Sequence, residues 1–313
     1  MKKILLKIFF LSIPIIILGI ILEIALRNIP NDYSVKNKYL TEHATEIETL
    51  ILGSSEATFG LDPKYFISNT FNSSYFAQDL NYDLLILKKF ENKLKNLKTI
   101  ILPISYITLY DNIELDFQSL LKNYKIYFGI KANTLSELKY NSELLNTHFS
   151  INKGYLYSYY IKRDPNNPLI FCTELGWCKT SSALNKDISD IDAVSLDQAI
   201  EDNSTVKKNE KLISENLSNL NSIINICRKN NINLVLFSAP TYKTYYDKID
   251  KDILINSINS SKDLAKTYEK CIYLDYSKGI GFNSKDYFDG VHLNKIGAKK
   301  LSLKLNQVIE DGF

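Results

Sequence analysis

Short apolar runs that end in a turn or a proline alternate with longer helical patterns along most of this chain. Four of these runs are short and apolar enough to be buried strands: TLILGSS (49–55), KTIILPIS (98–105), INLVLFSAP (232–240) and CIYLDY (271–276). Apolar residues at helical spacing predict helices over 82–97, 206–230, 251–269 and 294–310. Strands that alternate with helices form a parallel sheet with helices on both faces. The sequence therefore predicts an α/β fold, a three-layer αβα sandwich around a parallel sheet.

A long apolar run precedes this region. ILLKIFFLSIPIIILGIILEIAL extends from Ile4 to Leu26, and lysines lie at its start. As a helix the run is roughly 35 Å long, enough to cross a hydrocarbon core of about 30 Å. A cleaved signal peptide is the alternative, but its apolar core is shorter and ends in small residues, whereas Glu23 and Leu26 occupy that end here. We expect a helix over about 3–27 and an uncleaved signal anchor over 1–28. The clustered lysines predict a cytoplasmic N-terminus and an exported remainder.

The charge distribution agrees with that division. The formal net charge of +3 lies entirely in the first 30 residues, so the exported part is formally neutral. A nucleic-acid-binding domain would carry a basic excess, and no nucleic acid partner is expected. Residues 29–46 are polar and predict a stalk. The rest, 47–313, is expected to be one domain with an aromatic-rich insertion at about 106–205.

The first strand ends in the sequence LILGSSEATFGLDP, which contains Gly53, Ser54 and Ser55. We expect a turn there and a helix that begins near Pro63. A serine in such a turn lies at the carboxyl edge of the sheet, where ligands bind in this fold class. Backbone N–H groups of the turn can face a developing oxyanion. The alternative is an ordinary turn in which serine caps the next helix, and the tripeptide alone favours that alternative.

A second motif, DYFDGVHLNKIGAKKLS (286–302), precedes the last predicted helix. Asp289 lies three residues before His292, across Gly290. A carboxylate at this spacing can bind one imidazole nitrogen and leave the other to face a serine hydroxyl. The alternative is an Asp-Gly turn, a surface histidine and Asn294 as a helix N-cap. Taken alone, this motif also favours the alternative.

Together the two motifs resemble those of the SGNH, or GDSL-like, hydrolase superfamily, over about residues 47–310. The stretch FNSSYFAQDLNYDLLILKKFENKLKNLKTIILPISYITLYD (71–111) is similar to the second and third blocks of a membrane-anchored subgroup. That subgroup is related to the alginate O-acetyltransferases and the D-alanyl-lipoteichoic acid transfer protein. The resemblance implies a flavodoxin-like fold, with Ser55 as nucleophile, His292 as general base and Asp289 as its orienting partner.

The chain departs from the superfamily pattern in three places. Gly53-Ser54-Ser55 replaces the usual Gly-Asp-Ser. The second-block glycine is replaced in the segment around Ala77 and Gln78, and the third-block asparagine is replaced in PISY, which contains Ser105. The residues predicted to form an oxyanion hole are therefore Ser55, Ala77, Gln78 and Ser105. The oxyanion hole is therefore the part of the site that matches the superfamily pattern least. Losing one oxyanion donor costs a few kcal/mol of transition-state stabilisation.

The aromatic segment, the histidines and the cysteines give further expectations. Trp177, the only tryptophan, is the candidate for substrate contact, whereas aromatic packing of the insertion onto the core is the alternative for most of its tyrosines. His43 and His148 have no expected role.

Cys172 and Cys178 are close enough in sequence for a local disulfide in an oxidising compartment. Buried thiols are expected at Cys227 and Cys271.

No cofactor is expected, because neither a zinc-type Cys/His spacing nor a phosphate-binding glycine loop occurs. The expected partners are a glycan or an acylated small molecule, the membrane, and a membrane-bound protein that supplies the acyl group. Three functions stay open: O-acetyl transfer to or from a cell-surface or secreted polysaccharide, ester or lipid hydrolysis, and a catalytically silent scaffold in envelope assembly. The anchor favours transfer, and the departures in the oxyanion blocks favour the scaffold.

Overall fold

The computed structural model describes residues 2–131, 138–164, 169–178, 190–206 and 209–312. The chain divides into two compact units. The first contains Met1–Asn37 and Glu114–Ile170, and the second contains Lys38–Ile113 and Phe171–Phe313. The proposed boundaries of anchor, stalk and domain are not tested by this division and stay predictions.

The second unit is built on a five-stranded parallel sheet with the order β2-β1-β3-β4-β5. Its strands are β1 Thr49–Ile51, β2 Thr70–Asn72, β3 Thr99–Pro103, β4 Asn233–Ser238 and β5 Cys271–Asp275. This order is that of a flavodoxin-like, doubly wound sheet. The predicted αβα fold is confirmed. Strand β2 was not among the expected strands, because three residues, one of them Asn72, carry too little apolar pattern to be recognised.

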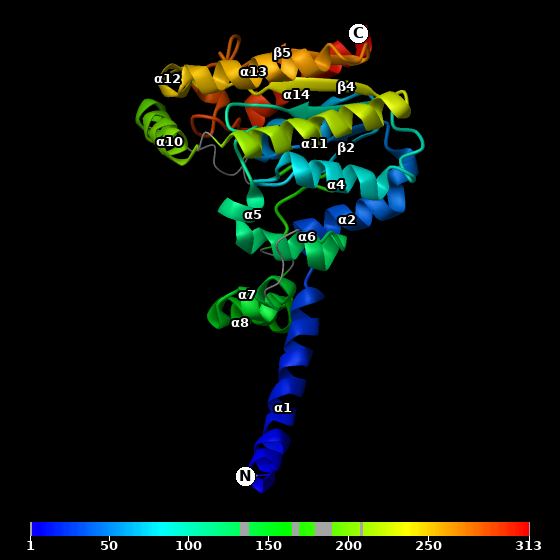
Figure 1. The fold of residues 1–313 in the computed structure, drawn as a ribbon, viewed down its shortest axis with the longest axis vertical. Coiled ribbons are helices and arrows are strands. Elements are labelled where there is room, and N and C mark those ends of the chain that lie inside the picture. Colours follow the sequence, from blue (N-terminus) through cyan, green and yellow to red (C-terminus); the bar gives the residue numbers. More distant parts are fainter. Residues whose placement is uncertain (1, 132–137, 165–168, 179–189, 207–208, 313) are drawn as a thin grey trace. The chain divides into compact units, whose positions relative to one another are not determined.

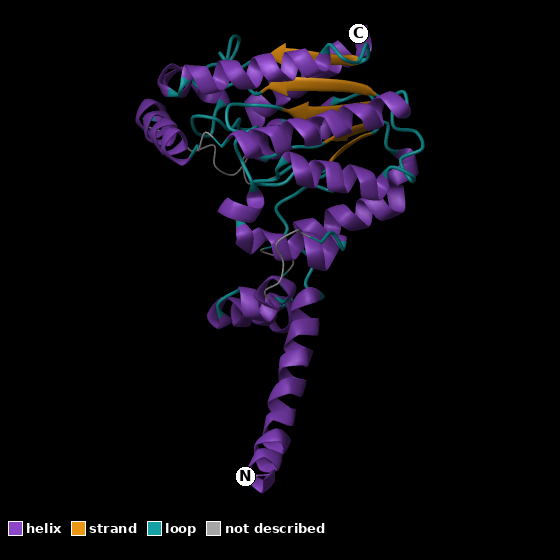
Figure 2. Cartoon of the chain, in the orientation of Figure 1, coloured by secondary structure: helices purple, strands orange, loops and turns teal. Residues whose placement is uncertain are grey.

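Helices cover both faces of the sheet (Figures 1 and 2). One face carries α3 Ser55–Gly60 and α14 Lys295–Asp311, which contact each other. On the other face lie α4 Leu80–Phe90, α11 Glu210–Lys229 and α13 Lys251–Ala265, with α11 in contact with both of its neighbours. Right-handed crossovers require this division, because the chain moves from β1 to β2 in one direction and then to β3, β4 and β5 in the other.

The remaining elements of the second unit are short, apart from α10. They are η1 Ala44–Glu46, η2 Pro63–Tyr65, α10 Ile191–Thr205, α12 Lys243–Lys248 and η6 Ser284–Asp286. Two helices extend across the boundary between the units, α2 Asp32–His43 and α5 Ile113–Asp116.

The core under α14 determines where the site lies. Ile51, Ile101 and Val235 of the strands are fully buried against Leu301 and Leu305 of α14, and Ala57 of α3 belongs to the same cluster. Burying several such side chains stabilises the contact by about 1.5–3 kcal/mol each. This packing places the loop before α14 next to the start of α3, at the carboxyl edge of the sheet.

In the first unit, α1 Lys2–Arg27 is a helix of 26 residues, which confirms the helix expected over about 3–27. Among the described residues it is the one helix long and apolar enough to cross a membrane, a property shared by anchors and signal sequences. The other elements of this unit are η3 Gln118–Leu120, α6 Leu121–Phe128, η4 Leu138–Asn141, α7 Glu143–Asn146, α8 Phe149–Leu156 and the π-helix η5 Tyr157–Lys162.

Candidate active site

Ser55 is the first residue of helix α3, and Ser54 is its N-cap in an extended conformation. The expectation that a helix begins near Pro63 is wrong, since only the 3-10 turn η2 begins there. The reason is that the chain turns directly from β1 into α3, and the Ser54 carbonyl accepts the N–H of Ala57 and of Thr58 at 3.1 and 3.0 Å. The first N–H groups of a helix lack an intrahelical acceptor, so the N–H of Ser55 is available to a ligand.

Gly53 allows the turn that brings Ser55 to the edge of the sheet. Its φ is +110°, and an added Cβ would lie 2.5 Å from Cδ of Pro103 on the neighbouring strand β3. Any other residue at position 53 would have a strained backbone conformation, and its Cβ would collide with the Pro103 ring. The Gly53 N–H donates to Oδ1 of Asp83 at 2.7 Å, which fixes the peptide that leads into the two serines.

Asp289 and His292 lie on a short hairpin before α14. Tyr287 and Leu293 form an isolated antiparallel bridge, and the N–H of Phe288 donates to the carbonyl of His292 at 2.8 Å. Inside this turn, Oδ1 of Asp289 accepts the backbone N–H of Val291 at 2.9 Å and of His292 at 2.8 Å. The carboxylate is therefore held by the backbone of the turn. Asn294 is the N-cap of α14 and accepts the N–H of Ile296, so this part of the alternative interpretation is found together with the Asp289–His292 contact.

The three predicted side chains converge. Oδ2 of Asp289 lies 2.7 Å from Nδ1 of His292, and Nε2 of His292 lies 2.8 Å from Oγ of Ser55. The His292 and Asp289 side chains are 12% and 17% exposed, and the Phe59 ring and the imidazole pack in a T-shaped arrangement with centroids 5.1 Å apart. The predicted convergence at the carboxyl edge of a parallel sheet is confirmed. Ser55 follows β1, which lies between β2 and β3, where the direction of winding reverses and ligands bind in such sheets.

The electrostatics of the pair follow from its burial and its hydrogen bonds. Burial disfavours the ionised Asp289, but the charge of His292 and the hydrogen bonds from His292 and Val291 outweigh it, so the pKa of Asp289 is below its ordinary value. Burial likewise disfavours the imidazolium, but Asp289 outweighs it, and Glu56 and Asp202 add smaller effects, so the pKa of His292 is raised above 6.5. The site stabilises an imidazolium next to Ser55.

A buried carboxyl group, which the sequence did not single out, lies under the serine turn. Asp83 of α4 is 1% exposed, and its Oδ1 accepts Nε2–H of Gln78 at 2.6 Å as well as the N–H of Gly53. Burial, opposed only in part by these hydrogen bonds, raises the pKa of Asp83 to about 8. In sequence Asp83 is one acidic residue in an amphipathic helix, and nothing in that pattern links it to Gly53.

The four predicted oxyanion residues differ in what they can donate. The side-chain N–H of Gln78 donates to Asp83, and its backbone N–H donates to the carbonyl of Tyr75 at 3.2 Å. The Ser105 hydroxyl accepts the N–H of Ala239 at 3.2 Å and so braces the loop after β3. Ala77 has a φ of 55°, in the left-handed region that favours glycine. Among the described residues, neither Ala77 nor Ser55 has an acceptor for its backbone N–H.

Helix α10 braces the turn that carries Asp289. Oε1 of Gln198 accepts the N–H of Gly290 at 3.0 Å, and the Gly290 carbonyl accepts the N–H of Tyr242 at 2.8 Å. An added Cβ on Gly290 would lie 3.0 Å from Gln198 and 3.1 Å from Ser195. The sequence did not indicate this contact, because Gln198 lies far from the motif along the chain.

Trp177 packs into the second unit and does not present its ring to solvent. It is 6% exposed, and Nε1–H donates to the carbonyl of Phe59 at 2.9 Å. Little of the ring is left for a sugar to stack on, so we remove Trp177 from the proposed substrate site. His43 bonds to Glu46, and His148 precedes α8, both outside the triad.

Cys172 and Cys178 face each other as an isolated antiparallel bridge, and both are buried. The expected disulfide is not formed in the structure, although directly opposed residues are close enough for one. Cys227 and Cys271 are buried thiols, as expected.

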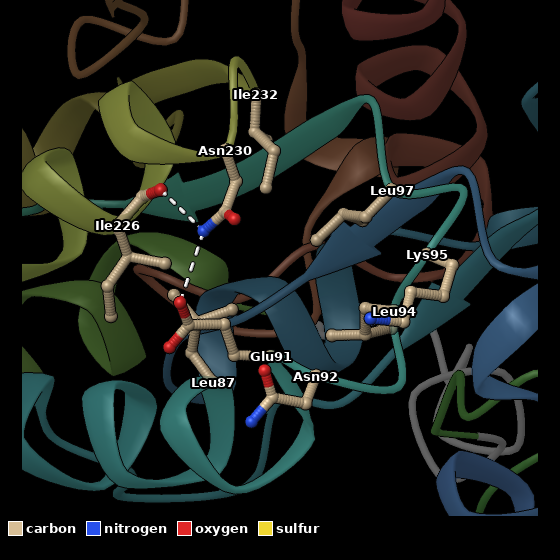
Figure 3. A pocket seen from close by; sticks show the side chains of 9 residues that line it. All are labelled: Leu87, Glu91, Asn92, Leu94, Lys95, Leu97, Ile226, Asn230 and Ile232. Carbon is tan, nitrogen blue, oxygen red and sulfur yellow. Dashed lines mark hydrogen bonds between the residues drawn. The ribbon is translucent and has the colours of Figure 1, made fainter.

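Two further features of the described residues bear on binding. Among the described residues, no group of three or more His, Cys, Asp or Glu side chains is placed to hold a metal ion. A pocket of about 150 Å³ lies between the C-terminal end of α4, the loop before β3 and the segment before β4 (Figure 3). It is at the amino edge of the sheet, and Ser55, Asp289 and His292 do not line it.

No protein-family model matches the sequence, and no curated protein matches it. Two solved structures illustrate its structural likenesses. One is a protein from Streptococcus pneumonia described as a candidate platelet activating factor, 12% identical, with 88% of this chain and 90% of that one covered and a TM-score of 0.44. The other is a GDSL-like lipase from Bacteroides thetaiotaomicron, 14% identical, with 89% and 98% covered and a TM-score of 0.41. At these values the likeness by itself assigns neither a family nor an activity.

Proposed function

We propose that this protein is a serine acyltransferase or esterase that works through an acyl-enzyme on Ser55. The observation that carries the proposal is the continuous hydrogen-bonded array from Asp289 through His292 to the Ser55 hydroxyl, with distances of 2.7 and 2.8 Å. A hydroxyl in contact with a histidine whose second nitrogen faces a carboxylate is the arrangement that activates a serine nucleophile.

In the first half of the reaction, Oγ of Ser55 attacks the acyl carbonyl while Nε2 of His292 takes its proton. Asp289 stabilises the imidazolium and holds the tautomer in which Nδ1 carries a proton. The backbone N–H groups of Ser55 and Ala77 are the proposed donors to the oxyanion. When the tetrahedral intermediate collapses, the bond to the leaving alcohol breaks and that alcohol takes the proton from His292.

In the second half, His292 removes a proton from the acceptor hydroxyl, whose oxygen attacks the ester on Ser55. The bond between the acyl carbon and Oγ of Ser55 then breaks, and Oγ takes the proton from His292, which restores the free enzyme. A sugar hydroxyl as acceptor gives O-acyl transfer, and water gives hydrolysis. We propose transfer of an acetyl group to or from a cell-surface or secreted polysaccharide. The support for this proposal is α1, because an apolar-rich helix of 26 residues suits an uncleaved membrane anchor. Such an anchor would hold the site on the outer side of the cytoplasmic membrane, where these glycans and a membrane-bound acyl donor meet. Simple ester hydrolysis is the second candidate, because the same array activates water.

The test uses the purified full chain in lipid nanodiscs. A chromogenic acetyl ester is supplied with and without a panel of oligosaccharides, and acetylated sugars are detected by mass spectrometry. We expect ester cleavage by the wild type and none by Ser55→Ala. Acetylated sugar supports transfer, whereas cleavage that no sugar accelerates supports hydrolysis. Absence of both cleavage and acylation of Ser55 in the wild type would overturn the proposal in favour of a silent scaffold.

A further inference from the structure

A short stretch of the first unit exposes a row of large apolar and aromatic side chains. Helices α7, α8 and η5 follow one another over residues 143–162, which we name the collar. Six of its side chains are between 42% and 69% exposed: Leu145, Phe149, Ile151, Tyr157, Tyr160 and Ile161. Soluble proteins rarely gather so many in one place, and such patches mark interaction sites.

Helix α8 buries a polar side chain and exposes two large apolar ones. Its one buried residue is Asn152, which is 1% exposed and donates through Nδ2 to the carbonyls of Leu144 and Thr147 at 3.3 Å. Phe149 and Ile151 of the same helix are 67% and 43% exposed. A helix on a soluble core buries its apolar side chains and exposes its polar ones. Here Asn152 is inside while Phe149 and Ile151 face outward, which suits an apolar surrounding.

Hydrogen bonds tie the collar to the last turns of α1. The Glu23 carboxylate accepts the backbone N–H of Glu143 at 3.0 Å and of Leu144 at 2.9 Å, so it caps α7. Arg27 pairs with Glu23 at 2.6 Å. At the other end of the collar, the hydroxyl of Tyr160 donates to the carbonyl of Ala25 at 2.9 Å. Figure 1 shows α7 and α8 beside the carboxyl-terminal turns of α1, with which both are in contact.

The position of Glu23 along α1 sets the depth of the collar. At a rise of about 1.5 Å per residue, Ile4 and Glu23 lie about 29 Å apart along the helix axis. A hydrocarbon core is about 30 Å thick, so with Ile4 at one boundary Glu23 lies at the other. The collar, bonded to Glu23, then lies at the level where acyl chains meet head groups.

We infer that the collar is a second membrane contact of this protein, lying in the bilayer interface beside α1 with its apolar side chains among the acyl chains. This inference rests on the anchoring by α1 proposed above. Five of the twenty collar residues are Phe or Tyr, whose rings favour the interface, and the exposed Lys153 and Lys162 can reach the head groups. An interfacial helix of this kind buries its apolar face just below the head groups.

The test introduces single tryptophans into the full chain and measures their quenching by brominated lipids. The reconstituted protein is placed in phosphatidylcholine–phosphatidylglycerol vesicles that carry bromine near the head group or deep in the acyl chain. The probes are Phe149→Trp and Ile161→Trp in the collar and Ile16→Trp within α1. The matched control is Ile280→Trp, an apolar site of the second unit that is 78% exposed. The emission of Trp177, measured in the unsubstituted protein, is subtracted.

We expect shallow bromines to remove most of the emission of the two collar probes, deep bromines to quench position 16, and neither to quench position 280. Quenching at position 16 without quenching in the collar overturns the inference and leaves the anchor intact. No quenching at position 16 overturns the anchor itself. If the collar emission is unquenched but shifts to the blue as protein concentration in the vesicles rises, a second copy covers the collar, and the lipid assignment is wrong. Equal quenching at position 280 would show that the whole protein adsorbs to the vesicles, and would overturn the inference that the collar is a specific membrane contact.

Discussion

Nε2 of His292 lies 2.8 Å from Oγ of Ser55, although 237 positions separate the two residues in the chain. The two residues belong to different local structures. Ser55 is held by the turn from β1 into α3, and His292 by the hairpin before α14. The packing of α14 on α3 brings the two together, so the hydrogen bond depends on the folded second unit as a whole.

The first prediction distinguishes the two adjacent serines. Ser55 faces His292, whereas the Ser54 hydroxyl donates to the carboxylate of Glu56. Ser55→Ala should abolish covalent labelling by a serine-directed phosphonate, and Ser54→Ala should leave labelling substantial. Mass spectrometry of the labelled peptide is the measurement. Labelling that survives in Ser55→Ala and is lost in Ser54→Ala would reassign the nucleophile to Ser54.

The second prediction concerns the pH dependence of the reaction. His292 must be neutral to accept the proton of Ser55, and its pKa is raised above 6.5, because the effect of Asp289 exceeds that of burial. The value of kcat/KM for an acetyl ester should therefore rise with pH, with a midpoint above 6.5, which reports the free enzyme. A rise centred below 6.5 would contradict the assignment of His292 as the base.

Asp289→Asn gives the third prediction. The amide oxygen can still accept the N–H of Val291 and His292, so the turn and the thermal stability should change little. The amide N–H₂ cannot accept from Nδ1 of His292, and the wrong tautomer then faces Ser55. We expect kcat to fall by about 10²- to 10⁴-fold. Activity within a few-fold of the wild type, at unchanged stability, would show that Asp289 does not orient His292.

The sequence was sufficient for those parts of the fold and site that repeat or lie close together. Long apolar strands such as 98–105 and 232–240 were recognisable, because burial on both faces leaves an uninterrupted apolar run. Asp289 and His292 are three residues apart and define a motif by themselves. Asp83 and Gln198 were missed, because each supports a backbone N–H far away along the chain. Only the sheet order and the packing of α4 and α10 create those contacts.

The fourth prediction concerns the N-terminus. If α1 is an uncleaved anchor, the protein isolated from membranes of the producing cell should keep Met1 or begin at Lys2. Glu23 is bonded to Glu143 and Leu144, so removing α1 would also remove the cap of α7. Intact-mass measurement and N-terminal sequencing test this. A mature sequence that begins near residue 30 would show that α1 is a signal peptide.

The last prediction concerns stability and Asp83. Its pKa rises from an ordinary value of 3.8 to about 8 on folding, so between these pH values the folded state binds one more proton than the unfolded state. The contribution of this group to the free energy of unfolding then falls with rising pH, by about 1.4 kcal/mol per pH unit. Asp83→Asn removes the titration, while its amide oxygen can still accept from Gly53 and Gln78. The stability of the variant relative to the wild type should increase through this window and level off above about pH 8.

Denaturant unfolding of the full chain in detergent, followed by the emission of Trp177, measures this difference, since Trp177 and Asp83 belong to the same unit. Asp263→Asn is the matched control, because it makes the same exchange of aspartate for asparagine at a side chain that is 72% exposed. Parallel stability curves for wild type and Asp83→Asn between about pH 5 and pH 9 would show that Asp83 titrates alike in both states. The carboxyl group under the serine turn would then be ionised at neutral pH, and its hydrogen bond to Gly53 would be charge-assisted.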